Sequence, residues 1–270
     1  MRFILLGSGA VRPELERWGP AQVVQVAGEH LLFDCGRGAT MRLVEAGIPI
    51  QEIRRVFFTH HHFDHNCDFA YLFLASWVLR RDVPMEVFGP RGTEAFCRAL
   101  LDDAYRDDIA TRREHPSYTA RGGEYVARDV TEEAWTLEGA GWRIRAVHVD
   151  HKSHILDNLA YRVEAEGKSI VIVGDTTVCE PLMTLAEGAD LLVHECTFPT
   201  EWCEKRGWGK WHTPPRELGR WARARGVKRL VLKHYAVQEG VEIEPMVEEV
   251  RSEFGSDGLI VGRDLLTIDV

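Results

Sequence analysis

The segment from Thr59 to His65 holds the residues best suited to chemistry in this sequence. It contains the pattern HxHxDH as His60, His62, Asp64 and His65. In an extended chain, side chains two positions apart point to the same side, so His60 and His62 can bind one metal ion. Asp64 and His65 can then turn toward a second ion. Imidazole and carboxylate ligands together suit Zn²⁺, with Mn²⁺ or Fe²⁺ as alternatives.

Several apolar runs elsewhere also end in a residue type that binds metals or transfers protons. Continuous apolar runs are typical of strands buried on both faces. Because ligands in α/β proteins gather outside the carboxyl ends of strands, we expect these residues at one rim of the fold. They are His60, His148, Asp175, His194, Glu195 and His234.

The elements that must position this rim follow from the hydrophobic pattern. Strands are expected at 2–6, 23–26, 30–33, 55–58, 85–88, 142–149, 160–165, 169–173, 191–193 and 229–232. Helices are expected at 40–46, 68–79, 93–104, 181–187, 215–225 and 245–254. The stretch 107–133 has weak periodicity, and no element is predicted there.

Composition limits the class of protein. The 270 residues include 33 basic and 42 acidic ones, a net charge of −9, whereas proteins that grip nucleic acid usually carry the opposite balance. The longest nearly apolar stretch, 69–79, is far shorter than the roughly 20 residues of a membrane span, and we expect no export signal. The six cysteines form no CxxC pair, so we expect free thiols and a cytoplasmic protein.

The chain resembles the metallo-β-lactamase fold hydrolases, and among them the ribonuclease Z and arylsulfatase-like phosphodiesterase branch. Besides HxHxDH, the resemblance is carried by Leu6-Gly7-Ser8-Gly9-Ala10, Leu32-Phe33-Asp34-Cys35-Gly36, Gly174-Asp175-Thr176 and Lys233-His234-Tyr235. It runs over nearly the whole chain. It implies an α/β fold, a four-layer αββα sandwich, in a single domain spanning 1–270. By family analogy it also implies a homodimer.

The resemblance further implies a binuclear metal centre. The implied ligands are His60, His62 and His154 for one ion, Asp64, His65 and His234 for the other, and Asp175 for both. His154 is ranked first for its position because the family places a lone histidine seven residues before a Tyr-Arg strand, here Tyr161-Arg162. His148 and His151 are rival candidates in the same stretch.

The same resemblance implies a mechanism, with Asp64, His212 and Glu195 as the catalytic residues. Two divalent ions, Zn²⁺ before Mn²⁺ or Fe²⁺, would lower the pKa of a bridging water, and the resulting hydroxide would attack the ester. His212 would protonate the leaving oxygen, and Glu195, in His-Glu-Cys-Thr-Phe, would orient it. An exposed loop histidine and a solvated carboxylate are the alternative interpretations of these two residues.

One departure from the family bears on the substrate. Transfer-RNA-processing ribonuclease Z enzymes carry a long arm between the third and fourth motifs, but here only 11 residues separate Arg162 from Gly174. Together with the acidic charge, this disfavours RNA. The sequence therefore predicts a binuclear zinc phosphodiesterase acting on a small-molecule ester or phosphodiester. The alternatives are a ribonuclease Z-like endoribonuclease acting on RNA 3′ ends, an arylsulfatase-like esterase and a non-catalytic metal-binding scaffold.

Four tryptophans between 202 and 221 leave two interpretations open. They could line the substrate mouth beside His212, where aromatic rings would stack on an aromatic leaving group or base. They could equally pack in the core or between subunits.

Overall fold

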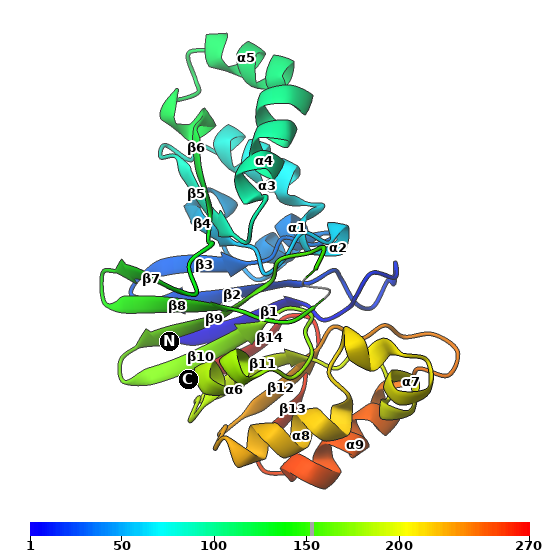
Figure 1. Cartoon of the computed structure of the whole chain (residues 1–270). Coiled ribbons are helices and arrows are strands. Elements are labelled where there is room, and N and C mark those ends of the chain that lie inside the picture. The colour runs from blue at the N-terminus through cyan, green and yellow to red at the C-terminus, as the bar shows by residue number, and fades with distance from the viewer. Residues whose placement is uncertain (152–153) are drawn as a thin grey trace.

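Two β-sheets stacked face to face organise the chain, as seen in a computed structural model that describes residues 1–151 and 154–270 (Figure 1). The first sheet consists, from edge to edge, of β14 (Leu266–Asp269), β1 (Arg2–Gly7), β2 (Ala21–Val26), β3 (Glu29–Phe33), β4 (Ile53–Phe57), β5 (Met85–Gly89) and β6 (Tyr125–Asp129). The second consists of β13 (Leu259–Val261), β12 (Leu230–Lys233), β11 (Leu191–Glu195), β10 (Lys168–Val173), β9 (Leu159–Ala165), β8 (Trp142–His148) and β7 (Ala134–Gly139).

Helices cover the outer face of each sheet. On the side of the first sheet lie α1 (Ala39–Glu45), α2 (Phe63–Asn66), α3 (Phe69–Val78), α4 (Thr93–Cys97) and α5 (Arg106–Glu114). On the side of the second lie α6 (Glu180–Ala186), α7 (Thr200–Lys205), α8 (Pro215–Ala224) and α9 (Ile243–Phe254). The expected four-layer αββα sandwich is therefore confirmed.

The central strands are apolar on both faces because each face meets a different layer. In β12, Val231 points into the core between the two sheets, whereas Leu230 and Leu232 point toward α8 and α9. A third core packs α1 and α3 on the first sheet. Strand burial on both faces explains why these runs do not alternate with polar residues.

The strand directions create the rim that the sequence predicted. Strands β3, β4 and β5 are parallel, as are β10, β11 and β12 in the other sheet. Parallel strands end at the same edge of a sheet, so residues that follow β4, β10 and β12 are brought together. None of the described helices is long and apolar enough to cross a membrane.

The structure adds elements that the sequence pattern did not reveal. The stretch 107–133 contains most of α5, which buries only Ile109 and so has no apolar stripe, and the strand β6. Strand β7 and the C-terminal strands β13 and β14 were also not predicted. The expected helix 93–104 is divided into α4 and a π-helix at Arg98–Ala104.

Candidate metal centre and active site

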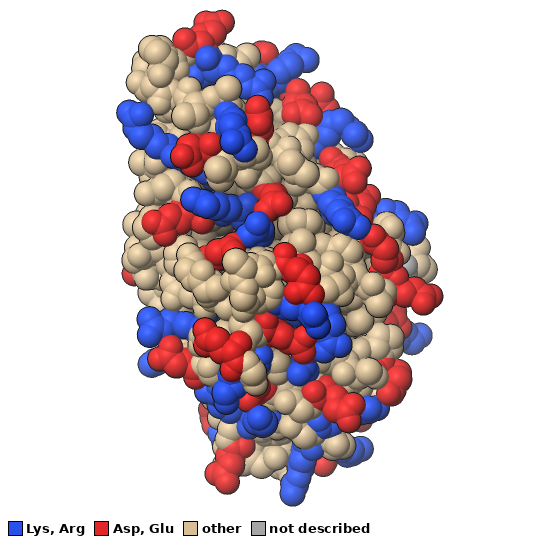
Figure 2. Space-filling view, turned by 90° about the vertical axis from the view of Figure 1, so that its left-hand side faces the viewer, with Lys and Arg blue, Asp and Glu red and all other residues tan. Residues whose placement is uncertain are grey.

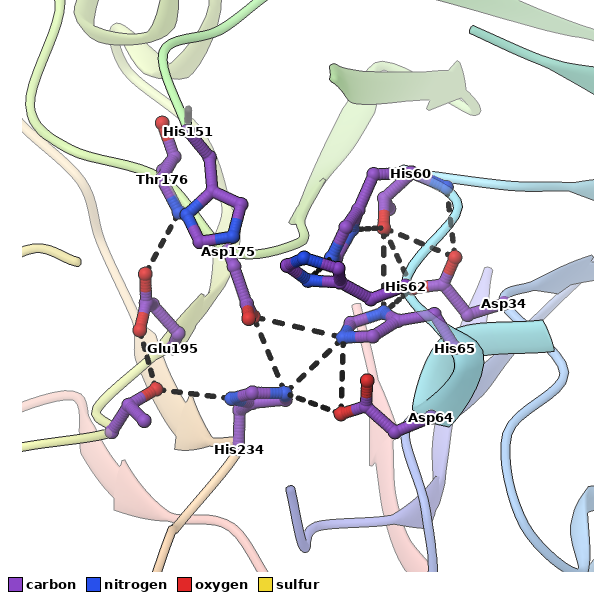
Figure 3. Close-up of polar contacts among 12 residues, drawn as sticks. Asp34, His60, His62, Asp64, His65, His151, Asp175, Thr176, Glu195 and His234 are labelled. Atoms are coloured by element: carbon purple, nitrogen blue, oxygen red, sulfur yellow. Dashed lines mark hydrogen bonds and ion pairs between the residues drawn. The ribbon is translucent and has the colours of Figure 1, made fainter. Parts of the chain in front are cut away.

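Two groups of side chains that could bind metal ions lie at the rim where β4, β10 and β12 end (Figure 3). In each group the candidate ligand atoms lie within 4.8 Å of one another. One group comprises His60, His62, His151 and Asp175, and the other comprises Asp64, His65 and His234. Residues far apart in sequence therefore meet because the strands that precede them end at the same rim.

Hydrogen bonds fix which ring nitrogen faces the centre in the second group. Nδ1 of His65 lies 2.9 Å from the carboxylate of Asp34, and Nδ1 of His234 lies 3.0 Å from the hydroxyl of Thr197, which itself donates to Glu195. Each Nδ1 is thus a protonated ring nitrogen, and the two Nε2 atoms face each other at 3.1 Å. Facing lone pairs at this distance need a proton or a cation to join them.

In the first group too, a hydrogen bond fixes which ring nitrogen of a histidine faces the centre. Nδ1 of His60 lies 3.1 Å from the hydroxyl of Thr59, so its Nε2 carries the lone pair, 2.9 Å from Nδ1 of His62. Nε2 of His151 and Oδ1 of Asp175 are buried without a hydrogen-bond partner. Buried polar atoms are normally satisfied, and a divalent cation would satisfy these. The donor set therefore fits the metal centre that the family implies.

The electrostatics of the site favour bound cations. Burial lowers the pKa of His60 well below its usual value and that of His62 to about 4, which keeps both rings in the neutral form that binds metals. Burial opposes protonation of His65 too, but Asp34, Asp64 and Asp175 together raise its pKa to about 9. In Asp175 burial opposes ionisation, yet His234 and the other imidazoles hold its pKa well below the usual range. The centre is thus a buried negative site.

The ranking of His154 above its rivals does not agree with the structure. His154 is exposed, whereas His151 is 1% exposed and belongs to the first group. The side-chain amide of Asn158 donates to the carbonyl of His151, and Nδ1 of His151 contacts the carbonyl of Trp211. These contacts hold His151 against the site, and counting back from Tyr161 could not reveal them.

The other histidines of these two segments have partners of their own. His148, the second rival, pairs with Asp157 at 2.7 Å and joins neither group. His61 lies 2.8 Å from the hydroxyl of Thr93 and also stands outside both groups. The remaining predicted ligands, His60, His62, Asp64, His65, Asp175 and His234, are all brought together.

Asp34 is a site residue that sequence reasoning missed. It is fully buried at the end of β3 with a φ of 58°, in the left-handed region that few residues other than glycine adopt. Its carboxylate accepts the backbone N–H of Thr59 at 2.8 Å and contacts His65. A carboxylate directly after a buried strand was the available signal.

Glu195 and His212 form the contact that the sequence suggested. Oε2 of Glu195 lies 2.7 Å from Nδ1 of His212, which leaves Nε2 as the ring nitrogen that can serve a substrate. The same Oε2 accepts the hydroxyl of Thr197, and Oε1 accepts the backbone N–H of Thr176 at 2.8 Å. Both oxygens are therefore engaged. Although Glu195 lies close enough to Asp175 and His234 to share a cation with them, its bonds mark it as an orienting group.

A cavity of about 220 Å³ opens above the two groups. Its polar lining comes from His62, Asp64, His151, Asp175, Thr197, His212 and His234, and its apolar lining from Ala10, Val11, Phe63, Phe198, Trp208 and Ala236. Trp208 thus belongs to the pocket, whereas Trp221 is buried in the core between α8 and the second sheet. Trp202 also packs against this core, so Trp208 is the tryptophan of this cluster that is placed to meet a substrate.

Sequence comparison places this architecture in a known group. The profile of the β-lactamase superfamily domain matches residues 29–235. The chain belongs to the metallo-β-lactamase superfamily. As a member of it, with a His/Asp cluster suited to divalent metal, the chain is a metal-dependent hydrolase, as predicted.

Two relatives of similar sequence are named ribonuclease Z, and one solved structure of similar fold is a tRNase Z. A protein named ribonuclease Z from Mycobacterium bovis (strain BCG / Pasteur 1173P2) is 30% identical over 279 residues, which cover 100% of this chain and 98% of that protein. A ribonuclease Z from Mycobacterium sp. (strain KMS) is 35% identical over 246 residues, 86% of this chain and 82% of that one. The crystal structure of the short form of human tRNase Z superposes with a TM-score of 0.77 at 23% identity, covering 100% of this chain and 99% of that chain.

Proposed function

We propose that this chain is a phosphodiesterase that works with two divalent ions, with Zn²⁺ preferred over Mn²⁺ or Fe²⁺. The observation that carries the proposal is the position of Asp175, which belongs to the first group of ligands and lies 3.3 Å from Nε2 of His234 in the second. A carboxylate between two sets of histidines suits a pair of ions. Such a pair supplies an activated water and neutralises charge on phosphoryl oxygens.

The protein's own groups have separate tasks in this scheme. His60, His62 and His151 would hold one ion, and Asp64, His65 and His234 would hold the other, with Asp175 within reach of both. His212 gives a proton from Nε2 to the leaving oxygen, and Glu195 orients the ring and stabilises it when it is charged. Asp34 and Thr59 keep His60 and His65 in the tautomer that presents Nε2 to the centre.

An endoribonuclease acting on RNA 3′ ends is the second candidate, and the relatives favour it. The Mycobacterium bovis ribonuclease Z is covered to 98% by an alignment of 279 positions, so it is nearly as short as this chain. A missing long arm therefore does not separate this chain from relatives of that name. The expectation that the missing arm disfavours RNA is therefore corrected.

Charge still favours a small phosphodiester as the substrate. The described residues that line the cavity include neither lysine nor arginine, although RNA-binding surfaces draw most of their affinity from such contacts. Figure 2 shows the side of the molecule away from this rim, where basic and acidic side chains are interspersed without a continuous basic surface. The net charge of −9 supports the same ranking.

The test is hydrolysis by zinc-loaded protein of bis-p-nitrophenyl phosphate, p-nitrophenyl sulfate and a precursor tRNA, measured side by side. We expect turnover of the diester with the tRNA uncut. Correct tRNA cleavage at a rate far above that of the diester would replace the first candidate by the second. Hydrolysis of the sulfate alone would point to the arylsulfatase-like alternative, and turnover of none of the three would contradict the proposal.

Two further features belong to the proposal. A cytoplasmic setting rests on the six free cysteines, and a homodimer rests on family analogy alone. Sedimentation of the full chain at micromolar concentration measures the second directly, and a single species of 30.7 kDa would refute it.

A further inference from the structure

An aromatic wall stands beside His212. The ring of Phe198 lies 5.2 Å from that of His212, edge to face at 81°, and Trp208 lies 4.7 Å from Phe198. Trp208 itself lies 6.0 Å from His212. These centroid distances are those of interacting aromatic pairs, so the three rings form one packed surface. Phe198 and Trp208 both line the cavity above the metal ligands.

We propose that Phe198 and Trp208 form the subsite for the leaving group and select a planar aromatic one. The inference rests on the proposed hydrolase function and names the substrate class of the same site. A proton donor must lie within hydrogen-bond reach of the leaving oxygen, so that oxygen lies beside His212. The group that the oxygen carries then meets the rings packed against His212. An aromatic ring or a nucleobase offers the flat face that such a wall accepts.

Two further apolar side chains at the cavity favour a substrate with little charge of its own beyond the phosphate. Phe63 stands between the ligands His62 and Asp64 and is 65% exposed, and Val11 beside the cavity is 48% exposed. Large apolar side chains at a cavity rim contribute little to folding while exposed, and such patches mark binding surfaces. Apart from the proposed metal ligands, Thr197 and His212, the described lining residues are all apolar, so this part of the cavity suits an apolar group.

The size of the cavity fits one ring. At about 220 Å³ it falls below the roughly 300 Å³ at which pockets for drug-sized ligands begin. A single aryl group or base can enter beside the phosphate, whereas the rest of a larger substrate must remain outside. Recognition then depends on the leaving ring rather than on an extended chain.

The test compares two leaving groups of similar acidity, so that chemical reactivity does not decide the result. Zinc-loaded wild type and the variant Trp208→Leu are assayed with methyl phenyl phosphate and methyl hexafluoroisopropyl phosphate. Loss of stacking should lower kcat/KM for the phenyl ester by roughly fivefold to tenfold, and leave the fluoroalkyl ester within about twofold. Trp208→Phe should recover most of the loss. Equal losses for the two esters would overturn the proposal.

Trp202→Leu is the matched control. Trp202 stacks on Phe198 at 5.9 Å and 13° but does not line the cavity, so its loss disturbs the same aromatic cluster and removes no ring that faces the substrate. We expect both esters to be hydrolysed as by wild type. A preferential loss for the phenyl ester in Trp202→Leu as large as in Trp208→Leu would refute a direct role for Trp208.

A binding measurement separates this inference from the proposed activity. Calorimetric titration with phenylphosphonate and methylphosphonate needs no turnover, and the aryl compound should bind roughly tenfold tighter to wild type and about equally to Trp208→Leu. If the protein hydrolyses none of the diesters but shows this preference, the aromatic subsite stands and the proposed function fails. If it hydrolyses diesters without the preference, the proposed function stands and the subsite fails.

Discussion

Oε2 of Glu195 lies 2.7 Å from Nδ1 of His212, and the same oxygen accepts the hydroxyl of Thr197. Thr197 in turn contacts Nδ1 of His234 at 3.0 Å. One buried carboxylate therefore orients both the proposed proton donor and a proposed metal ligand. Asp34 and Thr59 repeat this arrangement for His65 and His60 on the first sheet. The two halves of the site use the same device, a carboxylate acting partly through a threonine hydroxyl.

Replacing His212 tests the proton donor. Because His212 joins neither ligand group, His212→Ala should keep its full metal content while kcat falls by roughly 10²- to 10⁴-fold for phenyl esters. The loss should be much smaller for p-nitrophenyl esters, because that leaving group departs without a proton. Steady-state kinetics over a series of leaving groups, with metal analysis of each sample, measures both effects. A loss that is the same for every leaving group would refute general-acid catalysis.

The pair His151 and His154 tests the corrected ligand. Both lie in the same connection between β8 and β9, but only His151 is buried in a ligand group. His151→Ala should lower the zinc content toward one ion per chain and reduce kcat/KM by at least tenfold. His154→Ala is the matched control and should leave both quantities unchanged. Zinc loss in His154→Ala with retention in His151→Ala would restore the ranking that the sequence suggested.

The apolar strands were the part of the fold that the sequence predicted best, because strands such as β10 and β12 are buried on both faces and read as continuous apolar runs. Strands with a weaker hydrophobic pattern were not predicted, because few of their residues are buried. β7 buries little beyond Trp135, and β13 has no fully buried residue. Their place in the sheet depends on pairing with β8 and β12, which is a property of the whole fold.

The ligands that follow strands directly were predictable for a similar reason. His60, Asp175 and His234 each follow a buried strand, so chain order alone placed them at the rim. His151 lies in a longer loop, where hydrogen bonds to distant residues decide which histidine turns inward. Asp34 and His234 also adopt a positive φ, of 58° and 62°, which aspartate and histidine adopt more often than most residues but which the sequence alone does not assign to particular positions.

Asp190 should make stability depend on pH far from the metal centre. Burial opposes its ionisation, but Lys228, Ser169 and Lys168 lower its pKa to about 2. Since the pKa in the unfolded chain is about 3.9, the ionised carboxylate stabilises the fold at neutral pH, and this contribution is lost as the pH falls from about 4 through about 2.

The corresponding variant is Asp190→Asn. Because Lys168 and Lys228 are 48% and 63% exposed, water screens both ion pairs, and we expect the free energy of unfolding to fall by only about 1 kcal/mol at pH 7. Urea unfolding at pH 7 and at pH 3 measures the difference from wild type, which should shrink at the lower pH. A difference that is equal at both values would contradict the ionic origin.

Removal of metal should destabilise the whole protein, because the buried donor atoms of the two groups then lose the cation that joins them. Divalent ions that bind only the folded chain stabilise it, by about 4 kcal/mol at a concentration a thousandfold above Kd. Chelation should therefore lower Tm, and added Zn²⁺ should restore it.

In Asp175→Ala the shared ligand is lost, so zinc content, turnover and the response of Tm to zinc should all fall together. Asp190→Asn is the control, since its carboxylate lies outside both groups and its Tm should respond to zinc as that of wild type does. Full activity in Asp175→Ala would refute the two-metal scheme.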